Sequence, residues 1–154
     1  MKSIATIFAV MIAFSATAQT TFTYKTATAE IILLSEGQRE GGLNTLIGAT
    51  PEMIAEVAPS NTYPSATNAF LIRTKSGKNV LIDTGYGREL FNNLQSVGVT
   101  PESVDVILIT HLHGDHIGGL LREDKAAFPK AKLIMSKLEA QSANESTRKA
   151  MEQY

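Results

Sequence analysis

Cysteine is absent from this chain of 154 residues, and its absence excludes several kinds of site. Without a thiol there is no disulfide framework, no thiolate metal site, no cysteine nucleophile and no lipid carried by an N-terminal cysteine. Any metal ion must therefore be held by histidine, aspartate or glutamate. Histidine is also scarce, because the three in the chain are His111, His113 and His116, all within six residues.

Clustered positive charge is absent as well. The chain carries 14 lysines and arginines against 15 aspartates and glutamates, which gives a formal net charge of −1. Affinity for nucleic acid comes largely from grouped basic side chains that release counterions, so we predict no nucleic-acid partner. A content of 44% hydrophobic and 19% charged residues is typical of one soluble globular unit and excludes a disordered or collagen-like chain.

Residues 1–18 are predicted to be a secretory signal peptide. Lys2 precedes a largely apolar stretch at residues 4–14, and small side chains follow at Ala16 and Ala18. We predict cleavage between Ala18 and Gln19. The alternative, a membrane anchor, is disfavoured because the stretch is well short of the roughly 20 residues that span a bilayer. Residues 19–154 are therefore expected to be exported, periplasmic or secreted, with no stable membrane anchor.

Local signals predict alternating strands and helices after the signal peptide. Thr50 before Pro51 is typical of a helix start, and Gly77, in the polar stretch of residues 75–78 between two apolar runs, is typical of a hairpin turn. We predict strands within residues 22–34, 68–74, 79–82, 104–110 and 131–135, and helices at residues 51–57, 88–97, 100–102 and 117–121. Residues 36–42 are predicted to be a polar turn, residues 60–65 a loop, and residues 136–139 a capping box opening a final helix.

Four potential metal ligands follow the strand predicted at residues 104–110. On an extended stretch, His111 and His113 point to the same side, so both can reach one ion. Asp115 and His116, on a turn after Gly114, would be aimed at a second position. Imidazole and carboxylate suit a divalent ion such as zinc, and two ions roughly 3.5 to 4 Å apart can act on one substrate. The alternative is a polar loop with solvated histidines, which the crowding of all the histidines disfavours.

The string THLHGDHIGG at residues 110–119 resembles the signature of the metallo-β-lactamase superfamily, and LIDTG at residues 81–85 resembles that family's upstream strand end. The resemblance covers most of the chain from about residue 30 onward. It implies an α/β (α+β) fold, an αββα sandwich with its site at the mouth between two sheets. It also implies a metal-dependent hydrolase of a small-molecule substrate, with two zinc ions in the complete protein and a bridging hydroxide that attacks an ester, lactone, thioester or phosphoester.

The resemblance assigns roles to individual residues. His111 and His113 would hold the first metal, and Asp115 and His116 the second. Asp115 is also the candidate catalytic residue, orienting or shuttling a proton. Asp83 would support a metal ligand from behind, although it is equally interpreted as an ordinary turn aspartate.

His116 and its surroundings point to one branch of the family. Many lactam-hydrolysing members carry arginine at this position, whereas thioesterases, lactonases, organophosphate hydrolases and another lactamase branch carry histidine. Residues 81–87 and 99–105 look most similar to the lactonase and methyl-parathion-hydrolase-like branch. Tyr86 could line the pocket or be a surface aromatic residue.

The chain also departs from the family pattern. The pattern needs a third histidine for the first metal, a bridging aspartate and a last histidine for the second, and no histidine follows His116. Asp124 is too close to the motif to be the bridge. We therefore expect residues 19–154 to be the truncated N-terminal portion of the domain, inactive alone, with an apolar sheet face uncovered. The alternative is a non-catalytic metal-binding or half-domain remnant that pairs with another chain.

Overall fold

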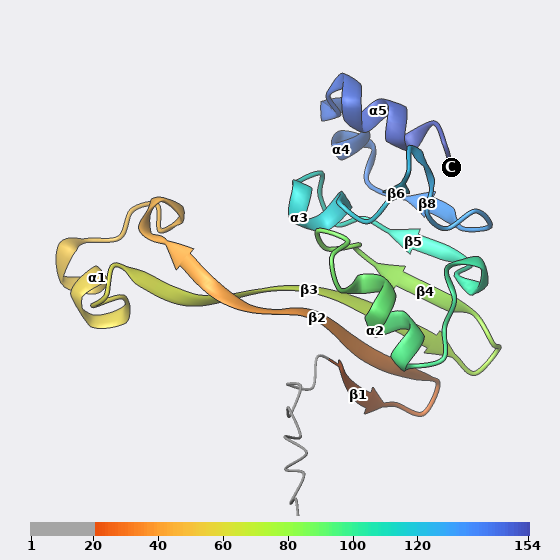
Figure 1. Ribbon diagram of the computed structural model, residues 1–154, viewed down its shortest axis with the longest axis horizontal. Helices are drawn as coiled ribbons and strands as arrows, with labels where there is room; N and C mark the ends of the chain where they lie inside the picture. Colours follow the sequence, from red (N-terminus) through yellow and green to blue (C-terminus); the bar gives the residue numbers. More distant parts are fainter. Residues whose placement is uncertain (1–20) are drawn as a thin grey trace, which may run out of the picture.

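The computed structural model describes residues 21–154 (Figure 1), so the expected signal peptide and its cleavage site at Ala18 and Gln19 lie outside the described residues. The main element is a six-stranded mixed sheet in the order β1-β2-β3-β4-β5-β8. Its strands are β1 (Thr21–Lys25), β2 (Ala29–Gly42), β3 (Thr62–Thr74), β4 (Asn79–Ile82), β5 (Val106–Leu108) and β8 (Lys132–Ile134). The small hairpin β6 (Leu121–Arg122) and β7 (Lys125–Ala126) forms a second sheet.

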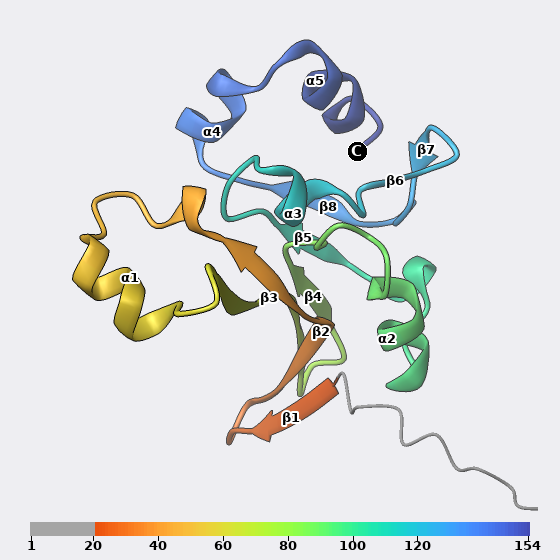
Figure 2. The same ribbon diagram turned by 60° about the vertical axis from the view of Figure 1, so that its left-hand side comes forward.

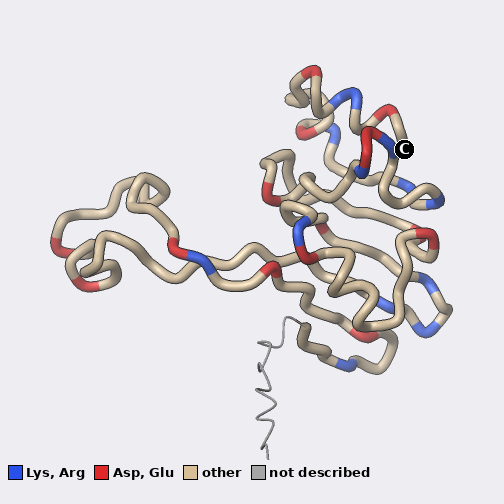
Figure 3. Tube along the Cα trace, in the orientation of Figure 1, with Lys and Arg blue, Asp and Glu red and all other residues tan. Residues whose placement is uncertain are grey.

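Short helices lie between these strands and after the last of them. They are α1 (Pro51–Val57), α2 (Leu90–Ser96), α3 (Gly114–Ile117), α4 (Lys137–Ser142) and α5 (Glu145–Met151), with 3-10 turns η1 (Leu43–Thr45) and η2 (Pro101–Ser103). Figures 1 and 2 show α2 against one face of the sheet and α4 and α5 beyond its β5–β8 end. In the described part of the chain, no helix has the length and apolarity needed to cross a bilayer. Basic and acidic residues are spread over many elements of the trace (Figure 3).

The sheet changes direction at β4. Strands β1 to β4 pair antiparallel, whereas β4, β5 and β8 run parallel, with α2 in the connection from β4 to β5. A parallel neighbour needs such a crossover, whereas the antiparallel β3 and β4 need only a tight turn. Gly77 provides that turn with a φ of 83°, as predicted. Because parallel strands end at one edge, the residues after β4 and β5 lie together there.

One face of the sheet forms the core. Leu71, Leu81 and Ile107 are fully buried on neighbouring strands, and Leu90 and Leu94 of α2 pack over them. Figure 2 shows α2 on this side of the sheet. Burying a side chain of this size contributes roughly 1.5 to 3 kcal/mol. This contact fixes α2 and the loop before it against the ends of the strands.

The opposite face carries an apolar row across all six strands. The pairing register places its members side by side, and four of them are 64%, 40%, 38% and 48% exposed: Phe22, Phe70, Leu108 and Ile134. Leu33 and Ile82 complete the row between them. The sequence predicts a sheet face that lacks its covering sheet; the structure shows a partly exposed apolar row, and the missing second sheet stays a prediction.

Strands β2 and β3 extend beyond the sheet as a two-stranded arm with α1 near its tip (Figures 1 and 2). Two sequence predictions are wrong here, because residues 36–42 continue β2 instead of turning and β3 begins at Thr62 instead of a loop to residue 65. Pairing across the arm satisfies the backbone groups of these polar segments, from Gln38 opposite Ala66 to Gly42 opposite Thr62. A register shift between Ser35 and Gln38 marks where the arm leaves the sheet.

The helices follow their local signals with two exceptions. Helix α1 has the predicted bounds, with the Thr50 hydroxyl accepting from the Met53 amide, and Gly98 ends the α2 segment with a φ of 72°. The helix predicted at residues 117–121 is wrong, because the helical turn is α3 and Leu121 pairs in β6. The predicted last helix is divided at Ala143, and Asn144 caps α5.

Candidate metal centre

Asp83 follows β4 directly and connects it to the histidine segment. Its Oδ1 accepts from the Thr110 amide at 2.8 Å and its Oδ2 from the Thr110 hydroxyl at 2.7 Å. The same Oδ2 lies 2.7 Å from His116 Nδ1. Asp83 is buried and has a φ of 57°, a left-handed conformation that costs roughly 1 to 2 kcal/mol outside glycine. These hydrogen bonds offset that cost.

The three histidines lie together at this edge of the sheet. The ring centroids of His111 and His113 are 4.6 Å apart, and those of His111 and His116 are 3.8 Å apart. His111 and His113 lie in the segment between β5 and α3, whereas His116 belongs to α3. The parallel alignment of β4 with β5 brings this segment beside Asp83, where the Asp83 amide donates to the Leu108 carbonyl at 2.9 Å.

The orientation of His116 is set from two sides. Its ring places Nδ1 on Asp83, and its Nε2 faces Asp115, with 3.8 Å between Nε2 and Oδ2. Its backbone carbonyl accepts from both the amide and the hydroxyl of Thr84, at 2.7 and 2.9 Å. A carboxylate behind one imidazole nitrogen is the usual support of a histidine that binds metal through the other.

Two glycines after α3 allow the loop that follows β4 to approach closely. A Cβ on Gly118 would lie 2.8 Å from the backbone of Tyr86, and one on Gly119 would lie 2.7 Å from the Thr84 carbonyl oxygen. The Gly118 amide donates to the Gly85 carbonyl at 2.9 Å. Any side chain at these two positions would separate the loop from α3, so the two glycines hold His116 and Asp83 in one rigid unit.

Glu139 is a residue of this site that the sequence did not reveal. The capping box predicted at residues 136–139 forms only in part, because Ser136 accepts from the Glu139 amide but the Glu139 carboxylate turns to the histidine segment. Its Oε2 accepts from the amide of Leu112, between His111 and His113, at 3.0 Å. The pattern of residues 136–139 signalled the helix start, whereas nothing local signalled a partner so far back in the chain. His111 and His113 line a cavity of about 300 Å³ together with residues of α4 and α5.

The imidazole and carboxylate groups of this site are donors that suit zinc. Within residues 21–154, no three His, Asp or Glu side chains are grouped so that they could hold one ion. The four expected ligands are His111, His113, Asp115 and His116, with two predicted for each ion. Imidazole and carboxylate are donors that zinc accepts, and the support of His116 by Asp83 leaves Nε2 available. Their assignment as ligands stays a prediction.

Tyr86 lines a different cavity from the one beside His111 and His113. It is half-buried, and its hydroxyl accepts from Arg39 Nη1 at 2.9 Å. The cavity beside it has a volume of about 160 Å³.

Comparison with known proteins gives a consistent result. The family model described as the metallo-beta-lactamase superfamily matches residues 62–153. The flavo-diiron protein FprA2 of Clostridium acetobutylicum is 40% identical over 86 residues, which are 54% of this chain and 20% of that protein. The chain therefore spans only a fifth of this curated relative.

Two solved structures resemble the fold over most of the chain. The hydrolase AbOPH of the beta lactamase superfamily has a TM-score of 0.72 and 28% identity, covering 81% of this chain and 47% of that one. AidC, a dizinc quorum-quenching lactonase, has a TM-score of 0.71 and 25% identity, covering 80% of this chain and 48% of that one. The chain spans about half the length of each, and the predicted α/β fold class is confirmed.

Proposed function

The chain belongs to the metallo-beta-lactamase superfamily, and from this premise we propose that it carries part of the metal centre of a metal-dependent hydrolase. The observation that supports this most directly is the contact between Asp83 and His116, 2.7 Å long, beside two further imidazoles. A buried carboxylate behind a histidine suits a metal ligand, and the superfamily provides the reaction class.

The proposed ligands are His111 and His113 for one ion and Asp115 and His116 for the other, with zinc as the metal. When bound, the two ions supply Lewis acidity at the scissile bond and lower the pKa of a water molecule. The chain's own residues would orient the metal ligands and move a proton. Asp83 holds the Nδ1 side of His116, so the ring cannot turn, and Asp115, facing Nε2 of that ring, accepts or returns the proton of the reaction.

The substrate proposed is an ester, lactone, thioester or phosphoester, with the lactonase and methyl-parathion-hydrolase-like branch as the nearest group. Likeness to a hydrolase and to a lactonase, with TM-scores of 0.72 and 0.71, supports this branch. His116, in place of the arginine of many lactam-hydrolysing members, supports it from the sequence. We also propose export through the signal peptide at residues 1–18, on the sequence pattern alone.

We further propose that residues 19–154 form one half of the sandwich and have negligible turnover alone. Two observations support this. Each ion would have two ligands among the described residues, whereas a catalytic zinc site typically has about three protein ligands. The apolar row through Phe70 and Leu108 lies open, on the face that a second sheet covers in a two-layer sandwich.

Zinc binding by the purified 154-residue chain tests the metal centre. We expect equilibrium dialysis followed by elemental analysis to find zinc bound, and His111→Ala to lose the ion shared with His113. Leu112→Ala is the matched control, because it changes the side chain between these histidines and keeps its backbone amide. If the unmodified chain takes up no zinc at stoichiometric protein concentration, the proposal is wrong.

Hydrolysis assays test the half-domain. Ester, lactone, thioester and phosphotriester substrates are offered to the zinc-loaded chain, and we expect no turnover above that of the His111→Ala variant. A robust rate that a chelator abolishes would refute the proposal that this chain alone is inactive. Zinc binding without turnover agrees equally with a non-catalytic remnant, and extending the reading frame beyond Tyr154 separates the two.

A further inference from the structure

The cavity beside Tyr86 gathers unpaired positive charge. The guanidinium carbons of Arg39 and Arg88 lie 4.8 and 5.0 Å from the centroid of the Tyr86 ring, and the hydroxyl of that ring accepts from Arg39. In the part of the chain that the structure describes, neither arginine forms an ion pair with a carboxylate. The one carboxylate that lines the cavity, Glu36, accepts from the backbone amides of Tyr86 and Arg88 at 3.1 and 2.9 Å.

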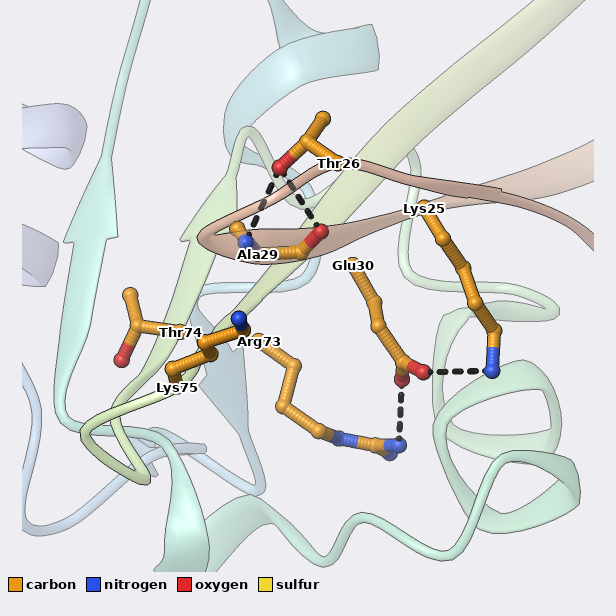
Figure 4. A pocket seen from close by; sticks show the side chains of 7 residues that line it. All are labelled: Lys25, Thr26, Ala29, Glu30, Arg73, Thr74 and Lys75. Carbon is orange, nitrogen blue, oxygen red and sulfur yellow. Dashed lines mark hydrogen bonds and ion pairs between the residues drawn. The ribbon is translucent and has the colours of Figure 1, made fainter.

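The larger cavity at the β1–β2 turn shows the contrasting case (Figure 4). Its volume is about 490 Å³, and Lys25, Arg73 and Glu30 all line it. There, Glu30 lies between the two cations, 2.9 Å from Lys25 and 3.1 Å from Arg73. Glu30 forms ion pairs with both of these cations, whereas in the Tyr86 cavity the carboxylate of Glu36 pairs with backbone amides and with neither arginine.

A buried hydroxyl at the same cavity lacks a partner. Thr67 lines the cavity, is 7% exposed and is the residue of the described chain whose buried side-chain oxygen makes no hydrogen bond. A buried hydroxyl without a partner is costly, and most are paired in native proteins. The two guanidinium groups beside it are complementary to an oxyanion, which arginine binds through paired N–H groups.

The cavity adjoins the proposed metal centre. The backbone of Tyr86 packs against Gly118, directly after α3, which carries Asp115 and His116. The pKa of Arg39 is raised above its ordinary value, first by the hydrogen bond to the Tyr86 hydroxyl and further by the negative charge of Asp115. The close approach of the Tyr86 backbone to Gly118 thus places the Tyr86 cavity next to α3.

We propose that the Tyr86 cavity is an oxyanion subsite that binds a phosphate or carboxylate group of the substrate, with Arg39 and Arg88 as its cationic contacts. That the bound anion belongs to a substrate rests on the hydrolase function proposed above, whereas anion binding itself does not. The subsite favours acidic esters over neutral lactones and triesters, because only an acidic substrate gains the charge-assisted hydrogen bonds.

Binding of inorganic phosphate and of acetate to the metal-free chain tests the subsite without any contribution from zinc. Isothermal titration calorimetry at low ionic strength measures the dissociation constants, and two-dimensional NMR locates the perturbed amides. We expect phosphate to bind and to shift the amides of Tyr86 and Arg88. Arg39→Gln and Arg88→Gln should each weaken phosphate binding at least about fivefold, the loss of one charge-assisted contact. The same losses with acetate identify a carboxylate subsite, whereas losses with phosphate alone identify a phosphate subsite.

Arg122→Gln is the matched control, since Arg122 also lies over an aromatic ring, 4.5 Å from the centroid of Phe91, but outside this cavity. Its phosphate affinity should equal that of the unmodified chain. Thermal unfolding monitors folding in each variant, and Arg88→Gln changes an exposed side chain, so it serves if Arg39→Gln does not fold. The proposal is overturned if phosphate and acetate each bind Arg88→Gln as tightly as they bind the unmodified chain. It is also overturned if neither anion binds the unmodified chain. Zinc binding in the same preparations reports separately on the metal centre.

Discussion

The Oδ2 atom of Asp83 lies 2.7 Å from Nδ1 of His116, although the two residues are 33 positions apart in the chain. The same carboxylate also accepts two hydrogen bonds from Thr110, so it joins the ends of two parallel strands to the helical turn that follows them. The geometry of the histidine cluster therefore depends on a buried side chain that is not itself expected to contact an ion.

Asp83→Asn should separate the support that the Asp83 carboxylate gives His116 from the left-handed backbone conformation at residue 83. Asparagine also tolerates a left-handed backbone, but its amide replaces one carboxylate oxygen and removes the charge behind the imidazole. We expect zinc affinity to fall about 10- to 100-fold, the usual cost of losing such a partner. Asp124→Asn is the control, because Asp124 has a φ of 61° close to the 57° of Asp83 and belongs to the β6–β7 turn. Equal zinc affinity in the two variants would contradict the supporting role.

Glu139→Ala should loosen the segment that holds His111 and His113. Without the carboxylate, the Leu112 amide loses its partner, which we expect to cost roughly 1 to 3 kcal/mol of unfolding free energy. Glu139→Gln retains an oxygen acceptor and should recover most of the stability and of the zinc affinity. Glu145→Ala is a control, because that carboxylate forms only an exposed pair with Lys149. A glutamine variant as damaged as the alanine variant would show that charge, and not the hydrogen bond, is what matters.

Gly119→Ala should destabilise the chain through backbone crowding. The new Cβ would lie 2.7 Å from the Thr84 carbonyl oxygen, and overpacking of this kind costs roughly 1 to 3 kcal/mol. Gly114→Ala provides the comparison, since its Cβ would meet no atom within 4 Å and alanine favours the helical turn α3. Urea unfolding followed by circular dichroism measures both. We expect Gly114→Ala to be more stable than Gly119→Ala. The reverse order would be inconsistent with this packing.

Tyr154 should make stability fall in alkaline solution. Burial raises the pKa of its phenol above the ordinary value, and its hydroxyl donates to the Leu120 carbonyl at 2.5 Å. Because the folded chain keeps the proton longer than the unfolded chain, this contribution is complete below about pH 10 and is lost as the pH rises through the folded pKa. Urea midpoints from pH 8 upward should fall more steeply for the unmodified chain than for Tyr154→Phe. Tyr24→Phe, at an exposed tyrosine, should follow the unmodified chain.

The sequence predicts those elements whose causes are local. Thr50 and Pro51 set the start of α1, and Gly77 and Gly98 set a turn and a helix end, because caps and left-handed glycines act within a few residues. The sequence does not predict the arm at residues 36–42, because its strand character comes from pairing with residues of β3 that lie 20 to 28 positions further along the chain. A polar composition alone is typical of a turn, and only pairing with the partner strand makes this segment a strand.

The candidate site divides in the same way. The sequence predicts the candidate ligands His111, His113, Asp115 and His116 because they lie close together in the chain. Asp83 remained ambiguous, and its contact with His116 depends on the parallel alignment of β4 and β5. Glu139 could not be found at all, since its side chain had an equally good local use in a capping box. Contacts made across the sheet edge are therefore what local patterns leave out.

The register of β4 against β5 has a consequence for how the chain takes up metal. Leu81 lies opposite Ile107, and both are fully buried, so a slip of one residue would expose the core. The same register places Asp83 beside Thr110 and thereby orients His116. The energy that holds the core together thus prepares the imidazoles before any ion arrives. Preorganisation of this kind removes an ordering cost from binding, so the folded chain is expected to capture zinc without first having to fold around it.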